Sequence, residues 1–125
     1  MQVELERQVT FGDGIESFRS HAHGVLSAET VQRTLQSAHA ARPDLWQVWS
    51  SLITHHLALD HLGEAEILAN GMCERFPLLP RSWLDRAKVA NARGRPAAEQ
   101  AALEQALQIS PSNAEAKKEL AALGS

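Results

Sequence analysis

The chain has 125 residues, of which 44% are hydrophobic and 22% are charged, and its formal net charge is -3. This composition predicts one compact soluble domain, and the mild acidity argues against nucleic-acid binding, which normally requires a basic patch. No apolar run approaches the roughly 18 residues of a membrane-spanning helix, and residues 1–11 are too charged for a secretory signal. The single Cys73 cannot form an internal disulfide. We therefore expect a cytoplasmic protein that is stabilised by packing alone and is not inserted in a membrane.

Residues 1–11 are expected to form an N-terminal arm. Val3, Leu5, Val9 and Phe11 fall on odd positions, as in an extended strand, whereas Leu5 and Val9 also suit one face of a short helix. We expect the arm to pack against the edge of the segment that follows. The functional alternative is an arm that pairs with another protomer or occupies a binding groove.

From residue 12 onward the sequence repeats with a period of 34 residues. A shift by this length superimposes Pro43, Pro77 and Pro111, and it superimposes Trp49 on Trp83. Such a period is typical of a solenoid of helical hairpins. The phase of the repeat divides residues 12–125 into three repeats and a capping helix, at about 12–45, 46–79, 80–113 and 114–123.

Local signals predict where the helices begin and end. The prolines of the repeat end the preceding helices, and Ser27 is the expected cap of a helix over about 28–41. The segment 94–96 (Gly-Arg-Pro) breaks the chain before a helix with proline at its first position. The segment 112–115 has the spacing of a capping box and predicts a last helix that ends before Gly124.

The repeat resembles the tetratricopeptide repeat family, whose pattern is Trp-x2-Leu-Gly-x2-Tyr, then Ala-x3-Phe, then Pro. The second repeat matches best, and it does so at Trp49, Leu52, Ala65 and Pro77. The third repeat keeps the tryptophan and the proline, and the first is degenerate. The resemblance implies an all-α fold, a right-handed superhelix of three helix-turn-helix repeats, in which Trp49 and Trp83 are largely buried. Trp46, which the pattern does not include, is expected to contact the neighbouring repeat.

In this family, partners bind mainly on the concave face, which the first helix of each repeat lines. By resemblance, this face should carry Asp13, Glu16, Ser20 and His23, then Gln47, Ser50, Thr54 and Leu57, then Arg81, Leu84, Lys88 and Asn91. The groove would then run from acidic through neutral to basic. Complementary charge would place the acidic end of a partner segment near Arg81 and Lys88.

The resemblance implies a non-catalytic protein-protein interaction module, an adaptor or chaperone-like protein that binds a segment of another protein. The alternative is a structural element for assembly or homodimerisation that acts through the edge of the first repeat. Some family members clamp the terminal carboxylate of heat-shock chaperones with lysines and asparagines. Among the equivalent positions of this chain, only Arg81 carries a suitable side chain. We do not expect that specific activity.

The six histidines and Cys73 raise the question of metal binding or catalysis. His21 and His55 are one repeat apart, hence roughly 10 Å apart, and neighbours such as His55 and His56 point about 100° apart on a helix. His56 replaces the buried tyrosine of the family and is expected to be a packed, neutral imidazole. Cys73 is expected to be a small buried hydrophobic residue. The sequence has no nucleophile turn or phosphate-binding loop. We expect no catalytic residue, no metal and no cofactor.

Overall fold

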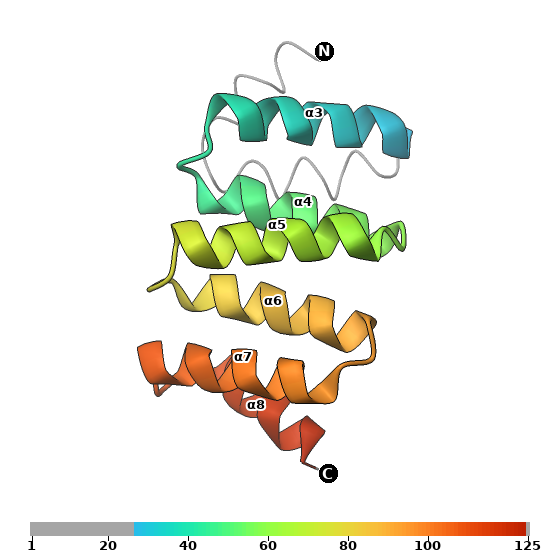
Figure 1. Ribbon diagram of the computed structural model, residues 1–125. Helices are drawn as coiled ribbons and strands as arrows, with labels where there is room; N and C mark the ends of the chain where they lie inside the picture. The colour runs from blue at the N-terminus through green and yellow to red at the C-terminus, as the bar shows by residue number, and fades with distance from the viewer. Residues whose placement is uncertain (1–26, 125) are drawn as a thin grey trace.

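The computed structural model describes residues 27–124, and these residues form six helices with no strand among them (Figure 1). The helices are α3 (Ala28–Ala41), α4 (Trp46–Ala58), α5 (Leu62–Arg75), α6 (Pro80–Ala92), α7 (Pro96–Ile109) and α8 (Ala114–Leu123). The expected N-terminal arm and the first helix of the first repeat lie outside the described residues. The described helices begin and end close to where the repeat boundaries and the prolines predict.

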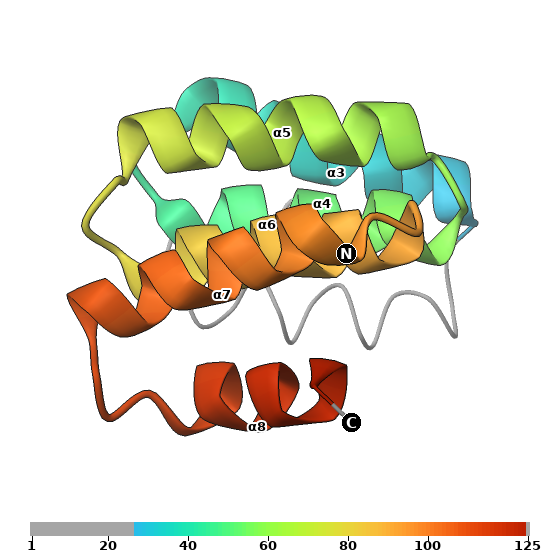
Figure 2. The same ribbon diagram turned by 60° about the horizontal axis from the view of Figure 1, so that its bottom comes forward.

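The helices form two layers. Helices α3, α5 and α7 lie in one layer, and α4, α6 and α8, each the first helix of its unit, lie in the other (Figure 2). Each helix contacts the next along the chain, and α4 also contacts α6. The molecule is therefore an all-α solenoid, and we call the surface of α4, α6 and α8 the first-helix face. None of the described helices is long and apolar enough to cross a membrane.

Two polar side chains cap helix N-termini. The Ser27 hydroxyl accepts a hydrogen bond from the Thr30 amide at 3.2 Å, as the sequence predicts for α3. At α8 the cap is Asn113, whose Oδ1 accepts from the Ala116 amide at 2.9 Å. The expected capping box, which began at Ser112, was therefore wrong by one residue, because an amide oxygen at 113 already satisfies the first-turn donor.

The turns inside the second and third repeats have the same backbone geometry. Asp60 has φ 61° and Gly94 has φ 69°, and these residues are 34 positions apart. The next residue in each turn donates its amide hydrogen to a carbonyl five residues earlier, from His61 to His56 at 2.8 Å and from Arg95 to Ala90 at 2.9 Å. The structural repeat thus has the period of the sequence, although an aspartate takes the left-handed position in one of the two turns.

The buried side chains form three clusters along the stack. The first joins α3 to α4, the second joins α4, α5 and α6, and the third lies among α6, α7 and α8. Cys73 is buried, as expected; its thiol donates to the Ser82 carbonyl at 3.3 Å, and burial raises its pKa to about 11. Trp46 is partly buried and packs against the second cluster.

The two repeated tryptophans are only partly buried. The indole Nε1 of Trp49 donates to the Pro43 carbonyl, and that of Trp83 donates to the Pro77 carbonyl, each at 2.9 Å. Both carbonyls belong to turns at the surface. Each side chain packs against a buried cluster while its N–H group finds an acceptor at the edge of the stack, so part of each ring stays exposed.

Candidate binding face

The predicted groove residues of the second and third repeats lie on α4 and α6. On α4, Gln47, Ser50, Thr54 and Leu57 are all partly exposed. On α6, Arg81 is partly exposed and Lys88 and Asn91 are exposed. The four candidates of the first repeat, Asp13, Glu16, Ser20 and His23, lie outside the described residues.

The resemblance predicts that Leu84 lines the groove and contacts a partner, but the structure buries this side chain. Its side chain is only 3% exposed and packs in the third cluster, against residues such as Ala87 and Leu103. An apolar side chain at this position gains more from packing against α7 than from facing water. Leu84 therefore belongs to the floor of the face.

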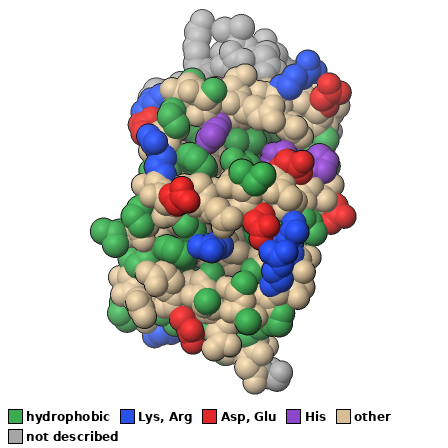
Figure 3. Space-filling model, in the orientation of Figure 1, with side chains coloured by type: hydrophobic (Ala, Val, Ile, Leu, Met, Phe, Trp, Pro, Cys, Tyr) green, Lys and Arg blue, Asp and Glu red, His purple; other side chains and the backbone are tan. Residues whose placement is uncertain are grey.

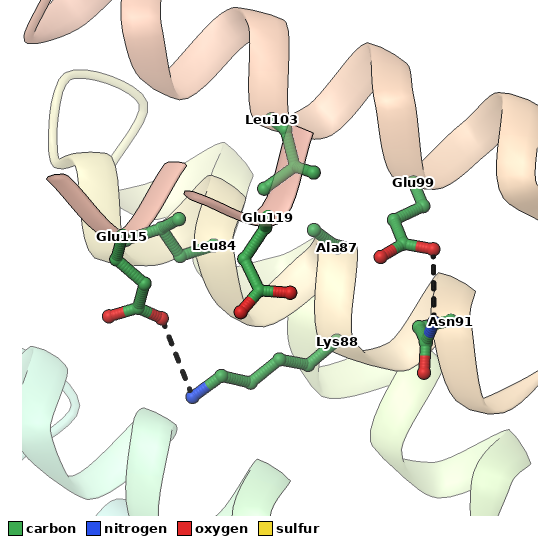
Figure 4. Close-up of a pocket in the computed structure, with 8 residues that line it drawn as sticks. All are labelled: Leu84, Ala87, Lys88, Asn91, Glu99, Leu103, Glu115 and Glu119. Atoms are coloured by element: carbon green, nitrogen blue, oxygen red, sulfur yellow. Dashed lines mark hydrogen bonds and ion pairs between the residues drawn. The ribbon is translucent and has the colours of Figure 1, made fainter. Parts of the chain in front are cut away.

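A hollow opens on the first-helix face between α6 and α8, with α7 beneath it. It encloses about 450 Å³ of empty space that is continuous with solvent. Figure 4 shows the side chains that line it, which are Leu84, Ala87, Lys88, Asn91, Glu99, Leu103, Glu115 and Glu119. Carboxylates and one ammonium group thus surround an apolar floor.

Arg81 is held by carboxylates of its own chain. Its Nη2 lies 2.8 Å from Glu115 Oε1, and its Nη1 lies 3.5 Å from Asp85 Oδ1. Only 28% of the Arg81 side chain is exposed. Lys88, which is more exposed, places its Nζ 3.9 Å from the second oxygen of Glu115. The positive charge expected at this end of the groove is therefore largely compensated within the molecule.

Two further arginines of the third repeat, Arg93 and Arg95, are also paired with a carboxylate. Arg95 lies 2.7 Å and Arg93 lies 3.7 Å from the Glu66 carboxylate on α5. Figure 3 views the molecule from the side of α3, α5 and α7, where acidic and basic side chains lie next to one another. The visible surface carries no broad patch of one charge sign.

The two carboxylates beside Arg81 have opposite pKa shifts. Asp85 is 1% exposed, and this burial raises its pKa, although hydrogen bonding to Ser50 and the charge of Arg81 act in the other direction. The pKa of Glu115 is lowered, chiefly by its hydrogen bonds to Arg81. Arg81 thus serves mainly as the partner of Glu115 and joins α6 to α8.

Asn91 and Thr54 also hydrogen-bond within the chain. The Asn91 amide Nδ2 donates to Glu99 Oε1 at 3.1 Å, and Glu99 is itself buried. The Thr54 hydroxyl donates to the Ser50 carbonyl at 2.9 Å in its own helix. Asn91 keeps an amide oxygen and Thr54 keeps hydroxyl lone pairs for other contacts.

Sequence reasoning missed three acidic residues of the hollow, Glu99, Glu115 and Glu119. The signal for one of them was present, because Glu115 follows Arg81 by 34 residues and so occupies the equivalent position at the start of the next helix. The capping helix was interpreted only as a cover for the apolar edge. In the structure it also supplies one wall of the hollow.

Residues 80–123 match the model of the tetratricopeptide repeat family. This segment comprises α6, α7 and α8, the helices that surround the hollow. No curated protein matches the chain. Helices α3, α4 and α5 continue the same two-layer stack, and the turn between α4 and α5 repeats the geometry of the turn between α6 and α7. Residues 80–123 therefore belong to the tetratricopeptide repeat family, and the described helices as a whole form a solenoid of that kind.

Proposed function

We propose that this protein is a non-catalytic interaction module, an adaptor or chaperone-like protein, that binds a segment of a partner protein on its first-helix face. The observation that carries the proposal is the open hollow between α6 and α8, which has an apolar floor and a rim of exposed Lys88, Asn91 and Glu119. A hollow of this kind accommodates a side chain of a docked segment, and the rim fixes its orientation.

The rim favours a partner segment that carries hydrogen-bond donors or positive charge. Among the lining carboxylates, Glu115 is bound to Arg81 and Glu99 is buried against Asn91, whereas Glu119 is exposed and forms no ion pair with the described residues. An acidic segment, which the sequence suggested, loses its main support because Arg81 is already bound to Glu115 and Asp85. Electrostatic complementarity sets the register and the association rate of such complexes more than their affinity.

The α4 part of the face extends the site with neutral groups. Gln47, Ser50 and Thr54 are partly exposed amide and hydroxyl side chains, which both donate and accept hydrogen bonds. These groups can hydrogen-bond to the backbone or to polar side chains of a partner segment that extends from the hollow along α4. We propose that Leu57, at the far end of α4, provides an apolar contact there.

Site-specific photo-cross-linking tests this proposal. A photoreactive residue is introduced singly at Thr54 or Asn91 on the first-helix face, and at Gln36 or Gln108, which are exposed on α3 and α7, as matched controls. We expect the same cross-linked partner from both first-helix positions and none from the controls. Cross-linking at the controls alone would contradict the proposal.

The mass of the cross-linked species separates partner capture from self-assembly. Adducts at Thr54 and Asn91 that have twice the mass of the chain, together with a dimer in light scattering, would contradict partner capture and favour an assembly element. Adducts of another mass from a monomeric protein would support the interaction module.

A further inference from the structure

Three side chains with metal-ligating atoms meet at the turn between α4 and α5. His56 lies in the last turn of α4, His61 directly precedes α5, and Glu64 lies in the first turn of α5. One ligand atom from each residue lies within 4.8 Å of the other two. This group is separate from the hollow between α6 and α8.

The two imidazoles face each other with the spacing that a shared ion requires. His56 Nδ1 lies 3.3 Å from His61 Nδ1. Two nitrogens bound to one tetrahedral Zn²⁺, at about 2.0 to 2.1 Å each, are about 3.3 Å apart. The two nitrogens are within hydrogen-bonding distance of each other, and both rings would turn their lone pairs toward a shared ion at this same separation.

The backbone of the turn holds the two histidines in this arrangement. The His61 amide donates to the His56 carbonyl at 2.8 Å, and the Ala65 amide donates to the His61 carbonyl at 3.1 Å. Asp60, between them, has the left-handed conformation. Because this turn fixes the relation of α4 to α5, binding an ion orders little additional chain, which lowers the entropic cost of forming the site.

One side chain of the group is buried and the other two are exposed, which suits a metal site. His56 is only 4% exposed, so the side chains packed around it hold its imidazole in place. His61 and Glu64 are exposed, so an ion can enter from solvent and keep a water molecule as its fourth ligand.

We propose that His56 Nδ1, His61 Nδ1 and the Glu64 carboxylate form a Zn²⁺ site that joins the end of α4 to the start of α5. Two imidazoles and one carboxylate suit zinc better than calcium or magnesium, which prefer oxygen ligands alone. The sequence argument missed this group because it compared histidines along one helix or in equivalent positions of two repeats. His56 and His61 are on opposite sides of a turn, where the helical angle per residue does not apply.

Zinc titration of the full chain by calorimetry, with thermal unfolding, tests the site. We expect one Zn²⁺ per chain and a rise of roughly 10 °C in Tm at a free zinc concentration about 100 times Kd. His61→Ala and Glu64→Gln alter exposed side chains, so both variants should fold. Each should weaken zinc binding by at least about tenfold, because even groups that only support a ligand contribute about 10- to 100-fold to metal affinity.

Glu74→Gln is the matched control, since Glu74 is exposed on the same helix as Glu64 but outside the group. It should bind zinc as the parent chain does. Substitution with Co²⁺ should give the intense visible absorption of tetrahedral coordination. Absence of one-to-one binding by the parent chain would overturn the proposal. Zinc affinity of His61→Ala equal to that of the parent chain would also overturn it, because the ion would then be bound elsewhere.

Discussion

Gly71, on α5, lies close to the ring of Trp49, the repeated tryptophan of the second repeat. A Cβ added at Gly71 would lie 3.0 Å from Cζ3 of Trp49. The indole cannot easily retreat, because its Nε1 is bound to the Pro43 carbonyl and its ring packs edge-on against Phe76 and His39. The close contact with Trp49 therefore favours glycine at this position, although glycine is unfavourable in a helix interior.

Gly71→Ala should lower the free energy of unfolding by about 1 kcal/mol. The strain of overpacking costs about 1 to 3 kcal/mol, which exceeds the gain of up to about 1 kcal/mol in helix propensity. Gly63→Ala on the same helix is the control, since no heavy atom lies within 4 Å of its added Cβ, and it should raise stability slightly. Urea unfolding measures both, and equal stabilisation of the two variants would show that Trp49 moves aside.

Asp85 is a carboxylate whose charged form is opposed by burial. Because burial raises its pKa in the folded state above the usual 3.8, the ionised form opposes folding at neutral pH. Asp85→Asn removes this cost, and Arg81 keeps its bond to Glu115. We expect the variant to be at least as stable as the parent chain at pH 7.

The pH dependence of this difference provides the check. As the pH falls through the raised pKa of Asp85 toward 3.8, the parent carboxyl becomes protonated and its cost disappears. The advantage of Asp85→Asn should therefore shrink on acidification. Urea unfolding of both proteins at pH 7 and near pH 4 measures it, and a variant that is clearly less stable at pH 7 would show that the pair with Arg81 outweighs the burial of the charge.

At the scale of the elements, proline positions and the 34-residue period were sufficient to predict the helices that the structure describes. Pro80 and Pro96 lie in the first turns of α6 and α7. Proline is favoured there because amide groups of the first turn have no acceptor within the helix, so its missing amide hydrogen costs nothing. The start of α8 was less well predicted, since Ser112 and Asn113 are both good capping residues. Neighbouring candidates of similar propensity are distinguished only by the local path of the chain.

Asn113→Ala should destabilise the protein by about 1 kcal/mol, because the Ala116 amide in the first turn of α8 loses its acceptor. Ser112→Ala should change the stability by less than about 0.5 kcal/mol, since Ser112 is exposed outside the helix. Thermal unfolding of the two variants distinguishes them. If Ser112→Ala were the more destabilising of the two, Ser112 would be the cap of α8.

At the scale of the whole molecule, the sequence predicted the solenoid and the positions that share its first-helix face, but not the charge of that face. The sequence prediction treats Arg81 and Lys88 as free cations, although Asp85 follows Arg81 by one helical turn and Glu115 follows it by one repeat. In the structure, the buried Asp85 and Glu115 on α8 both lie beside Arg81. The reversal of Arg81 to glutamate would therefore place three carboxylates together and damage the fold.

Lys88 is the better position for testing the charge of the face, because it is exposed. If the partner segment is basic, as the lining carboxylates suggest, Lys88→Glu should tighten its binding by severalfold, with an effect that declines as salt screens the charges. Lys117→Glu on α8 is the control, since Lys117 is exposed and does not line the hollow. Weaker binding by Lys88→Glu would instead indicate an acidic partner.

The third buried cluster packs three helices, α6, α7 and α8, against one another, whereas the buried residues of the first join only α3 to α4. In a solenoid each unit is stabilised by its own core and by the interface with its neighbour, so the end whose core packs three helices can stay folded while the other end opens. The ion pair of Arg81 with Glu115 strengthens this end because it joins α6 to α8. Amide hydrogens of α6 and α7 should consequently exchange with solvent more slowly than those of α3, and unfolding should spread from the N-terminal end toward the segment that holds the hollow.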